Sequence, residues 1–412
     1  MPEFRTHRSL SEIPATLWDA LHSGDNPFVR HAFLRGLEEH GCLRPQWGWT
    51  PLHATLWDGD ELIAAAPGYL KANSHGEFVF DYAWAAALER VGHDYYPKWL
   101  FAVPYTPVNG PRLLARDADA RRALCMAILE ETRRRSLPSL HINFLPEAES
   151  NDCPQAWLER NDVQFHWRNA PDNLAAAPWR DFEDFLAALQ SKKRKNIRAE
   201  RAQVRHAGIG FRIVHGDEAS AIDIAAMHAL YCNTFADKGN SPALTLEFFR
   251  HLAQTMPRQL VLILAERHGS AHPEPVEGQA HQEREIIAGA LYLRGGDTLY
   301  GRYWGCMKEV PGLHFETCYY QGIDYCLREG LSVFEPGAQG EHKIARGFLP
   351  VITRSRHHFM QPGLDEAFAR WCTEERESIR RYRDAVLAHS PYRDAPVITS
   401  TSAHGEPVEP SS

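Results

Sequence analysis

A segment near the C-terminal end of the chain gathers four side chains that can do acid–base or anion chemistry. These are Glu341, His342, Lys343 and Arg346, with glycines at 337, 340 and 347 around them. A carboxylate and an imidazole can take up a proton, while an ammonium and a guanidinium can offset negative charge. Glycine lets the backbone approach a ligand closely. Segment 334–348 is therefore predicted to be a functional loop, and the alternative is a solvated loop with a few charges.

A second concentration of charge lies in the segment 191–206, which is predicted to be helical. Seven basic residues oppose Glu200 alone, a local charge of +6 in a chain of net charge −8. They are Lys192, Lys193, Arg194, Lys195, Arg198, Arg201 and Arg205. Such a run attracts phosphates through long-range electrostatics and counterion release. We predict that the first five bind substrate phosphates, and the alternative is a solvated helix face.

The composition is that of an ordinary water-soluble protein. The chain has 412 residues, 44% hydrophobic and 24% charged, a length that predicts two domains. Residues 1–17 lack the apolar centre of a secretory signal, and no stretch approaches the ~20 apolar residues that span a bilayer. The eight cysteines show no Cys-x-x-Cys spacing. We expect a cytoplasmic location, reduced thiols and no metal site.

The pattern of apolar residues divides the chain into two halves with the same order of elements. In the first half, strands are expected at 53–57, 62–71, 77–84 and 139–145, a hairpin turn at Asp58-Gly59, and a helix at 119–135. In the second half, strands are expected at 259–266, 285–294, 298–306 and 331–335, and a helix at 314–329 with Gly330 as its C-terminal cap. A last helix is expected at 365–387.

The predicted domain boundaries follow from this repeat. The first domain is expected at 1–170, and the second, with the functional loop and the basic helix, at 171–390. An eight-residue segment that begins at Ser270 recurs at Ser402 with one change, and its composition cannot build a core. Residues 268–284 are therefore predicted to be a disordered insertion, and residues 391–412 a disordered tail.

Several of these segments resemble one family of proteins. The hairpin 286–292, the strand 300–305, and the segments 334–337 and 342–348 resemble tandem GNAT acyltransferases, in particular their FemAB-like branch. Within that branch, a subgroup of peptidoglycan biosynthesis or recognition proteins resembles the sequence over nearly its whole length. The resemblance implies an α/β fold with a mixed sheet in two tandem GNAT-like domains. It also implies a basic helix where residues 191–206 lie.

The resemblance implies an N-acyltransferase, because FemAB-like enzymes transfer an aminoacyl group from aminoacyl-tRNA to an amine of a peptidoglycan precursor. Such a transfer needs a neutral amine and a stabilised oxyanion. We assign removal of the amine proton to Glu341 or His342 and charge stabilisation to Lys343. Tyr303 is assigned to protonation of the leaving group. A bulge in the strand 300–306 would present backbone donors. Substrate binding is assigned to Arg302, Trp304, Lys308 and Arg346.

The acyl donor stays open between aminoacyl-tRNA and acyl-CoA, and we expect no tightly bound cofactor. Ordinary GNAT enzymes hold the CoA pyrophosphate with a glycine-rich loop. The corresponding residues 307–316 contain Pro311, which has no N–H, and lack the second glycine. Two other functions remain possible: a non-catalytic binder of a phosphorylated cell-wall precursor or RNA, and a CoA-dependent N-acetyltransferase of small amines.

Overall fold

The structure is a computed structural model that describes residues 2–22, 26–169, 177–268, 284–337 and 340–393. Its strands pair both in parallel and antiparallel within one eleven-stranded sheet, so the predicted mixed α/β class is confirmed. In the described ranges, no helix is both long enough and apolar enough to cross a membrane.

The first half of the chain builds a small sheet and one end of the large sheet. Its strands are β1 (Glu3–His7), β2 (Trp49–Pro51), β3 (His53–Asp58), β4 (Glu61–Ala66), β5 (Gly68–Lys71), β6 (Lys98–Phe101), β7 (Leu114–Ala115), β8 (Ser139–Asn143) and β9 (Leu158–Arg168). Its helices are α1 (Ala15–Asp19), α2 (His31–Glu39), α3 (Tyr82–Arg90), α4 (Ala118–Arg134) and α5 (Glu147–Asp152).

Two helices join this half to the second, α6 (Phe182–Ala188) and the basic α7 (Ser191–His206). The strands of the second half are β10 (Ile209–His215), β11 (Leu260–His268), β12 (Arg284–Gly295), β13 (Thr298–Cys306), β14 (Val333–Glu335) and β15 (Leu349–Phe359). Its helices are α8 (Ala221–Asp237), α9 (Leu246–Thr255), α10 (Leu313–Phe315), the π-helical turn η4 (Glu316–Tyr320), α11 (Gln321–Glu329), the 3₁₀ helix η5 (Glu341–Arg346) and α12 (Leu364–Leu387).

Local sequence explains several of the turns and helix ends. Gly59 has a φ of 61° in the turn between the antiparallel strands β3 and β4, which confirms the predicted hairpin turn. The single return strand predicted at 62–71 is wrong: it is divided at Pro67, with β4 in the small sheet and β5 in the large one. Gly330 ends α11 with a φ of 69°, a left-handed conformation that glycine adopts without strain, as predicted. At the start of α8, Ser220 and Asp223 satisfy each other's backbone N–H groups in a capping box.

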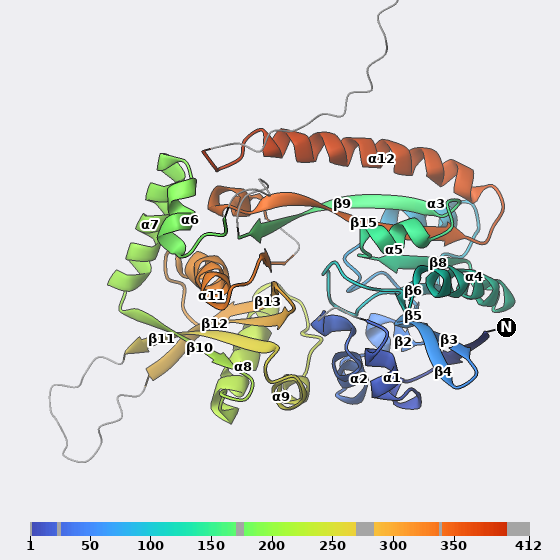
Figure 1. Cartoon of the computed structure of the whole chain (residues 1–412), viewed down its shortest axis with the longest axis horizontal. Coiled ribbons are helices and arrows are strands. Elements are labelled where there is room, and N and C mark those ends of the chain that lie inside the picture. Colours follow the sequence, from blue (N-terminus) through green and yellow to red (C-terminus); the bar gives the residue numbers. More distant parts are fainter. Residues whose placement is uncertain (1, 23–25, 170–176, 269–283, 338–339, 394–412) are drawn as a thin grey trace, which may run out of the picture.

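The last strand of each half pairs with the other half. In the large sheet the order is β10-β11-β12-β13-β14-β9-β15-β8-β6-β5-β2. Thus β9, which ends the first half, pairs with β14 of the second, and β15 pairs with β8 of the first. The two exchanged strands also pair with each other along their length and run beneath α12 (Figure 1). The sheet is therefore continuous from one half to the other.

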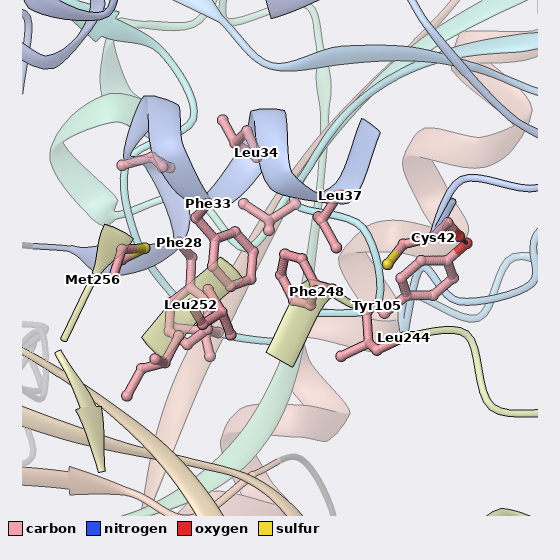
Figure 2. Packing of buried hydrophobic residues seen from close by; sticks show 14 of the residues in the cluster. Phe28, Phe33, Leu34, Leu37, Cys42, Tyr105, Leu244, Phe248, Leu252 and Met256 are labelled. Atoms are coloured by element: carbon pink, nitrogen blue, oxygen red, sulfur yellow. Dashed lines mark hydrogen bonds between the residues drawn. The ribbon is translucent and has the colours of Figure 1, made fainter. Parts of the chain in front are cut away.

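The hydrophobic core is shared in the same way. Side chains of α2, in the first half, pack against side chains of α9, in the second (Figure 2). The rings of Phe33 and Phe248 meet edge to face, with their centroids 5.5 Å apart. Such contacts bury apolar area from both halves at once, so each half contributes to the stability of the other.

The strand predicted at 77–84 is wrong, because residues 77–81 form a loop and α3 begins at Tyr82. The side chains of Glu77 and Asp81 both pair with the buried Lys98, and Phe78 has a φ of 62°, which a strand does not allow. At the predicted tail, Tyr392 is buried and its Oη donates to the carbonyl of Gly347. Of the insertion predicted at 268–284, His268 ends β11 and Arg284 begins β12, and residues 269–283 lie outside the described residues. Of the tail predicted at 391–412, residues 394–412 lie outside them.

Candidate functional site

The candidate site lies where two neighbouring strands of the second half part. β13 and β14 pair in parallel over only three residue pairs, which end at Tyr300 and Glu335. Beyond this point β13 continues beside β12, whereas β14 ends at Glu335 and is followed by Pro336 and Gly337, which still lie against Gly301 of β13. The 3₁₀ helix η5, which carries the predicted functional residues, comes after them in the chain. The fold therefore brings the predicted loop to the end of the β13–β14 pairing.

β13 bulges at this point. Leu291 opposes Tyr303 and Tyr292 opposes Gly301, so Arg302 is an extra residue in β13. Arg302 donates to the carbonyl of Tyr105 at 2.6 Å, and the hydroxyl of Tyr303 lies 3.5 Å from the same oxygen. The bulge that the sequence analysis expected is thus present, and its two side chains contact the first half.

Tyr303, the predicted proton donor, lies in the core between the halves. Its ring centroid is 4.8 Å from that of Tyr231 on α8, and Arg302 stacks over both its ring and that of Phe28. Among the described residues, no contact joins Tyr303 to His342 or Lys343. Both side chains therefore have a role in packing between the halves, and Arg302 also lies near Glu335 of the predicted loop.

Lys343 is the most unusual group of the loop. Its side chain is buried, with 2% of the residue exposed, and its ammonium donates to the carbonyl of Gly337 at 2.7 Å. No carboxylate pairs with it within the part of the chain that the structure describes. Burial lowers the pKa of Lys343 to about 8, because a charged ammonium loses its hydration there.

Lys98 provides a comparison with Lys343, because it is a lysine with carboxylate partners. It is also buried, but Glu77 lies 2.8 Å from its ammonium and Asp81 also contacts it. These two carboxylates raise the pKa of Lys98 above its ordinary value although burial acts against them. A buried cation normally has such partners. The ammonium of Lys343 is thus a charge that a ligand's negative oxygen can balance.

His342 lies beside Lys343 and is exposed to solvent. Its Nε2 lies 2.9 Å from the hydroxyl of Tyr319, on the π-helical turn. Partial burial and the neighbouring cations Lys343 and Arg346 lower the pKa of His342, so that its imidazole is neutral at pH 7 and can accept a proton. The ring of His314 stands between it and Trp304, with centroids 6.2 Å and 5.2 Å away.

Glu341 and Arg346 are engaged with other elements. Glu341 is exposed and accepts a hydrogen bond from Tyr382 of α12 at 2.6 Å. The buried Arg346 donates to the carbonyl of His342 and to the carboxylate of Glu200, each at 2.8 Å, and its guanidinium stacks on a phenylalanine ring of α10. Arg346 therefore fixes the shape of η5, although the sequence analysis assigned it to substrate binding.

The basic helix α7 is attached to the site through its acidic residue. Glu200 accepts from both Arg346 and Tyr320, and Arg201 pairs with Glu316 and Asp324. The predicted phosphate-binding residues lie on the other face or at the start of the helix. Those that are exposed are Lys192, Lys195 and Arg198, and those that are half-buried are Lys193 and Arg194. Lys308 is also exposed, and its ammonium lies 3.0 Å from Glu285.

Glu335 is a candidate that the sequence analysis missed as a functional group. Only 12% of its side chain is exposed, and its Oε2 has no hydrogen-bond partner among the described residues. Burial raises its pKa to about 8, in spite of the nearby guanidinium groups of Arg112 and Arg302. His166 of β9 lies 3.8 Å away. The local sequence reads as an ordinary strand end, because the groups that enclose Glu335 come from distant segments.

The site contains no metal-binding cluster in the described ranges: no group of three or more His, Cys, Asp or Glu side chains converges there or elsewhere in them. Its titratable groups are instead the imidazole of His342, the ammonium of Lys343 and the carboxyl of Glu335. Groups with perturbed pKa values are typical of a functional site. His166 is the side chain between them: it lies 3.8 Å from Glu335, and the charge of Lys343 contributes to lowering its pKa.

Comparison with known proteins gives the family. A family described as FemAB-like, peptidoglycan biosynthesis/recognition, matches residues 9–394. No curated protein matches the chain. Similar solved structures include FemX, with 12% identity over 89% of this chain and 100% of that one and a TM-score of 0.48. They also include L-PGS from Bacillus licheniformis, with 9% identity over 81% and 94% and a TM-score of 0.45. A tandem GNAT protein from the clavulanic acid biosynthesis pathway has 12% identity over 88% and 100% and a TM-score of 0.40.

These structural likenesses are distant, whereas the family match covers nearly the whole chain. It includes both halves, the exchanged strands, the basic helix and the loop with Lys343. The protein belongs to the FemAB-like family.

Proposed function

We propose that the protein is an N-acyltransferase that transfers an acyl or aminoacyl group to an amine of a peptidoglycan precursor. The observation that carries the proposal is the buried ammonium of Lys343, which has no carboxylate partner among the described residues and lies where β13 and β14 part. A fixed positive charge in a site sheltered from water stabilises an oxyanion far more than it would in water. Family membership supports the same class of reaction.

The neighbouring groups supply the proton transfers of this proposal. The neutral imidazole of His342, which contacts Tyr319, takes a proton from the attacking amine directly or through water. A C–N bond then forms, and Lys343 stabilises the negative oxygen of the tetrahedral intermediate. When the ester C–O bond breaks, the protonated carboxyl of Glu335 gives its proton to the leaving oxygen. Glu335 takes the role that the sequence analysis gave to Tyr303.

The packing of α7 favours aminoacyl-tRNA over acyl-CoA as the donor. Gly312, in the loop where GNAT enzymes hold the CoA pyrophosphate, lies against α7: a Cβ added to it would be 3.1 Å from the carbonyl oxygen of Glu200. Val204 of α7 and Leu313 share one apolar cluster beside this loop. The helix thus covers the loop on one side and presents basic side chains to solvent, an arrangement that suits a phosphodiester chain.

To test the proposal, the full chain is incubated with a peptidoglycan nucleotide precursor and either aminoacyl-tRNA or acetyl-CoA. The mass of the precursor is then measured by mass spectrometry. We expect its mass to rise by one aminoacyl residue with aminoacyl-tRNA, and no change when the acceptor amine is blocked beforehand. Acetylation from acetyl-CoA would support the small-amine acetyltransferase instead. Binding of the precursor without any mass change, whichever donor is present, would overturn the proposal in favour of a non-catalytic binder.

A further inference from the structure

Two buried polar side chains on β9 form a line that begins at Glu335. Phe334 pairs with Trp167 across the antiparallel strands β14 and β9, so the next residues, Glu335 and His166, lie opposite each other. Nδ1 of His166 is 3.8 Å from Oε1 of Glu335. Side chains two residues apart on a strand share a face, which places Gln164 beside His166. Its Oε1 lies 3.3 Å from Nε2 of the imidazole.

The far end of this line fixes the direction of its hydrogen bonds. Nε2 of Gln164 donates to the carbonyl of Pro107 at 2.7 Å. A carbonyl oxygen only accepts, so the amide nitrogen of Gln164 must face Pro107 and its Oε1 must face His166. Because Oε1 also only accepts, Nε2 of His166 carries a ring proton. The amide of Gln164 therefore determines which nitrogen of the imidazole is protonated.

The surroundings of the imidazole keep it neutral. Gln164 and His166 are only 4% and 5% exposed. Burial, together with the positive charges of Arg168 and Lys343, lowers the pKa of His166 to about 3. A neutral imidazole has one ring proton, which the hydrogen bond to Gln164 holds on Nε2. The Nδ1 that faces Glu335 is then a bare acceptor, which repels a carboxylate and attracts the O–H of a protonated carboxyl.

Several other groups act on the proton of Glu335. Those that favour its ionised form are the guanidinium groups of Arg112, Arg302 and Arg168 and the backbone N–H of Asn109. Burial outweighs them and raises the pKa of Glu335 to about 8. The buried phenol of Tyr300 also lies near, and its own raised pKa keeps it neutral. An acceptor on His166 stabilises the same protonated form of Glu335 that burial favours.

We propose that Gln164 and His166 are positioning residues that keep the carboxyl of Glu335 protonated and hold its O–H toward Nδ1 of the imidazole. The use of this proton in acyl transfer rests on the proposed function. The 3.8 Å contact is longer than a hydrogen bond, and catalytic contacts are often this long without substrate and shorten when it binds. A half-turn of the carboxyl carries the O–H to the side of Oε2, where no described residue competes for it.

The first test is ¹⁵N nuclear magnetic resonance of the full chain with labelled histidine. The signals of His166 are identified by their absence from His166→Asn, and they show which ring nitrogen carries the proton. We expect a protonated Nε2 and a bare Nδ1 between pH 5 and pH 8. A proton on Nδ1, alone or together with one on Nε2, would overturn the proposal.

The second test is the titration of Glu335, followed by ¹³C resonance with labelled glutamate and identified by the signal lost in Glu335→Gln. In Gln164→Leu the imidazole is free to move its proton to Nδ1 and to donate to a carboxylate. We therefore expect the midpoint of the titration to fall by at least one pH unit, a tenfold change in the acid constant. Gln164→Glu, which keeps an oxygen toward Nε2, should not lower the midpoint.

The matched control is Gln190→Leu, because Gln190 also donates to a backbone carbonyl, that of Ser390. Glu335 should titrate in this variant as in the wild type. Equal midpoints in the wild type and Gln164→Leu would overturn the proposal.

The link to the reaction is measured separately, as the pH dependence of the transfer rate. The pH above which the rate falls should move down in Gln164→Leu together with the midpoint of Glu335. If the wild type transfers no acyl group while the midpoint still moves, the proposed function fails and the positioning of the Glu335 proton stands.

Discussion

The contrast between two buried lysines leads to the first prediction. Lys343→Met removes a buried charge that lacks a carboxylate partner, so we expect unchanged or greater stability. Lys98→Met leaves Glu77 and Asp81 buried without their cation, and we expect a loss of about 3–5 kcal/mol. Urea unfolding of both variants checks this. If Lys343→Met destabilised the fold as much as Lys98→Met, its ammonium would have a structural role instead.

Because the pKa of Glu335 is raised, we expect the stability of the fold to decrease as the pH rises toward 8. Its pKa is about 8 in the folded chain and about 4.5 in the unfolded chain, so the folded state binds more protons between these values. Its contribution to stability is full below pH 4.5 and is lost as the pH rises toward 8. The unfolding free energy of the wild type should therefore fall between pH 5 and pH 8. We expect this fall to be smaller in Glu335→Gln, by more than about 1.4 kcal/mol, which corresponds to one pKa unit.

The exposed Glu309 provides the control. In Glu309→Gln, the unfolding free energy should fall between pH 5 and pH 8 by as much as it does in the wild type. Equal pH dependence in the wild type and Glu335→Gln would show that Glu335 is ionised throughout this range. In that case it could not act as the proton donor of the proposed reaction.

At the level of residues, the sequence predicted the groups that are close together along the chain. Glu341, His342, Lys343 and Arg346 lie in one helical turn and a half, so their proximity needed no knowledge of the fold. The partner of Arg346 on α7 and the surroundings of Glu335 come from segments far away, and no local pattern indicates them. The burial of Lys343 also could not be predicted, because it depends on the packing of η5.

Among the elements, α7 and η5 are joined by a charged contact that can be tested. Glu200→Gln removes the carboxylate that binds Arg346 and Tyr320, and it leaves a buried guanidinium without its ion pair. We expect a loss of about 1–3 kcal/mol and faster hydrogen exchange in both 191–206 and 341–346. Glu183→Gln, which removes an exposed pair with Arg198, serves as the control. Faster exchange in α7 alone would contradict a coupling between the two elements.

Element prediction succeeded where periodicity and turn residues agreed. The hairpin β3–β4, the helices α4 and α12, and α11 with its glycine cap lie where the sequence placed them. The loop at 77–81 has three consecutive apolar residues between two acidic ones, as a short strand can, but the two acidic side chains turn inward to Lys98. That ion pair joins segments about twenty residues apart, and a local pattern cannot show it.

For the whole molecule, the exchange of β9 and β15 predicts that the halves do not fold separately. A fragment of residues 1–169 would keep β9 without β14 and β15, and it would leave β8 paired with β6 alone. It would also expose the apolar face of α2 that packs against α9 (Figure 2). We expect the fragment to lack a cooperative thermal transition by circular dichroism, whereas the full chain unfolds in one. A fragment with a sharp transition of its own would contradict this.

The repeat of elements was visible in the sequence, but the exchange of strands was not. Both halves contain the same order of hairpin, helix and strand, which periodicity reveals. The partners of β9 and β15 are set by their place in the large sheet, which a local pattern does not show. The continuous sheet also shapes the candidate site, because β9 brings His166 of the first half within 3.8 Å of Glu335.

The central claim is that Lys343 stabilises the oxyanion of an acyl transfer. It is tested most directly by the single-turnover rate of transfer from aminoacyl-tRNA to the precursor amine, measured for the wild type, Lys343→Met and the exposed control Arg250→Met. We expect transfer by the wild type and the control, and a rate about 10²–10³-fold lower in Lys343→Met. A wild-type rate in Lys343→Met would contradict the claim.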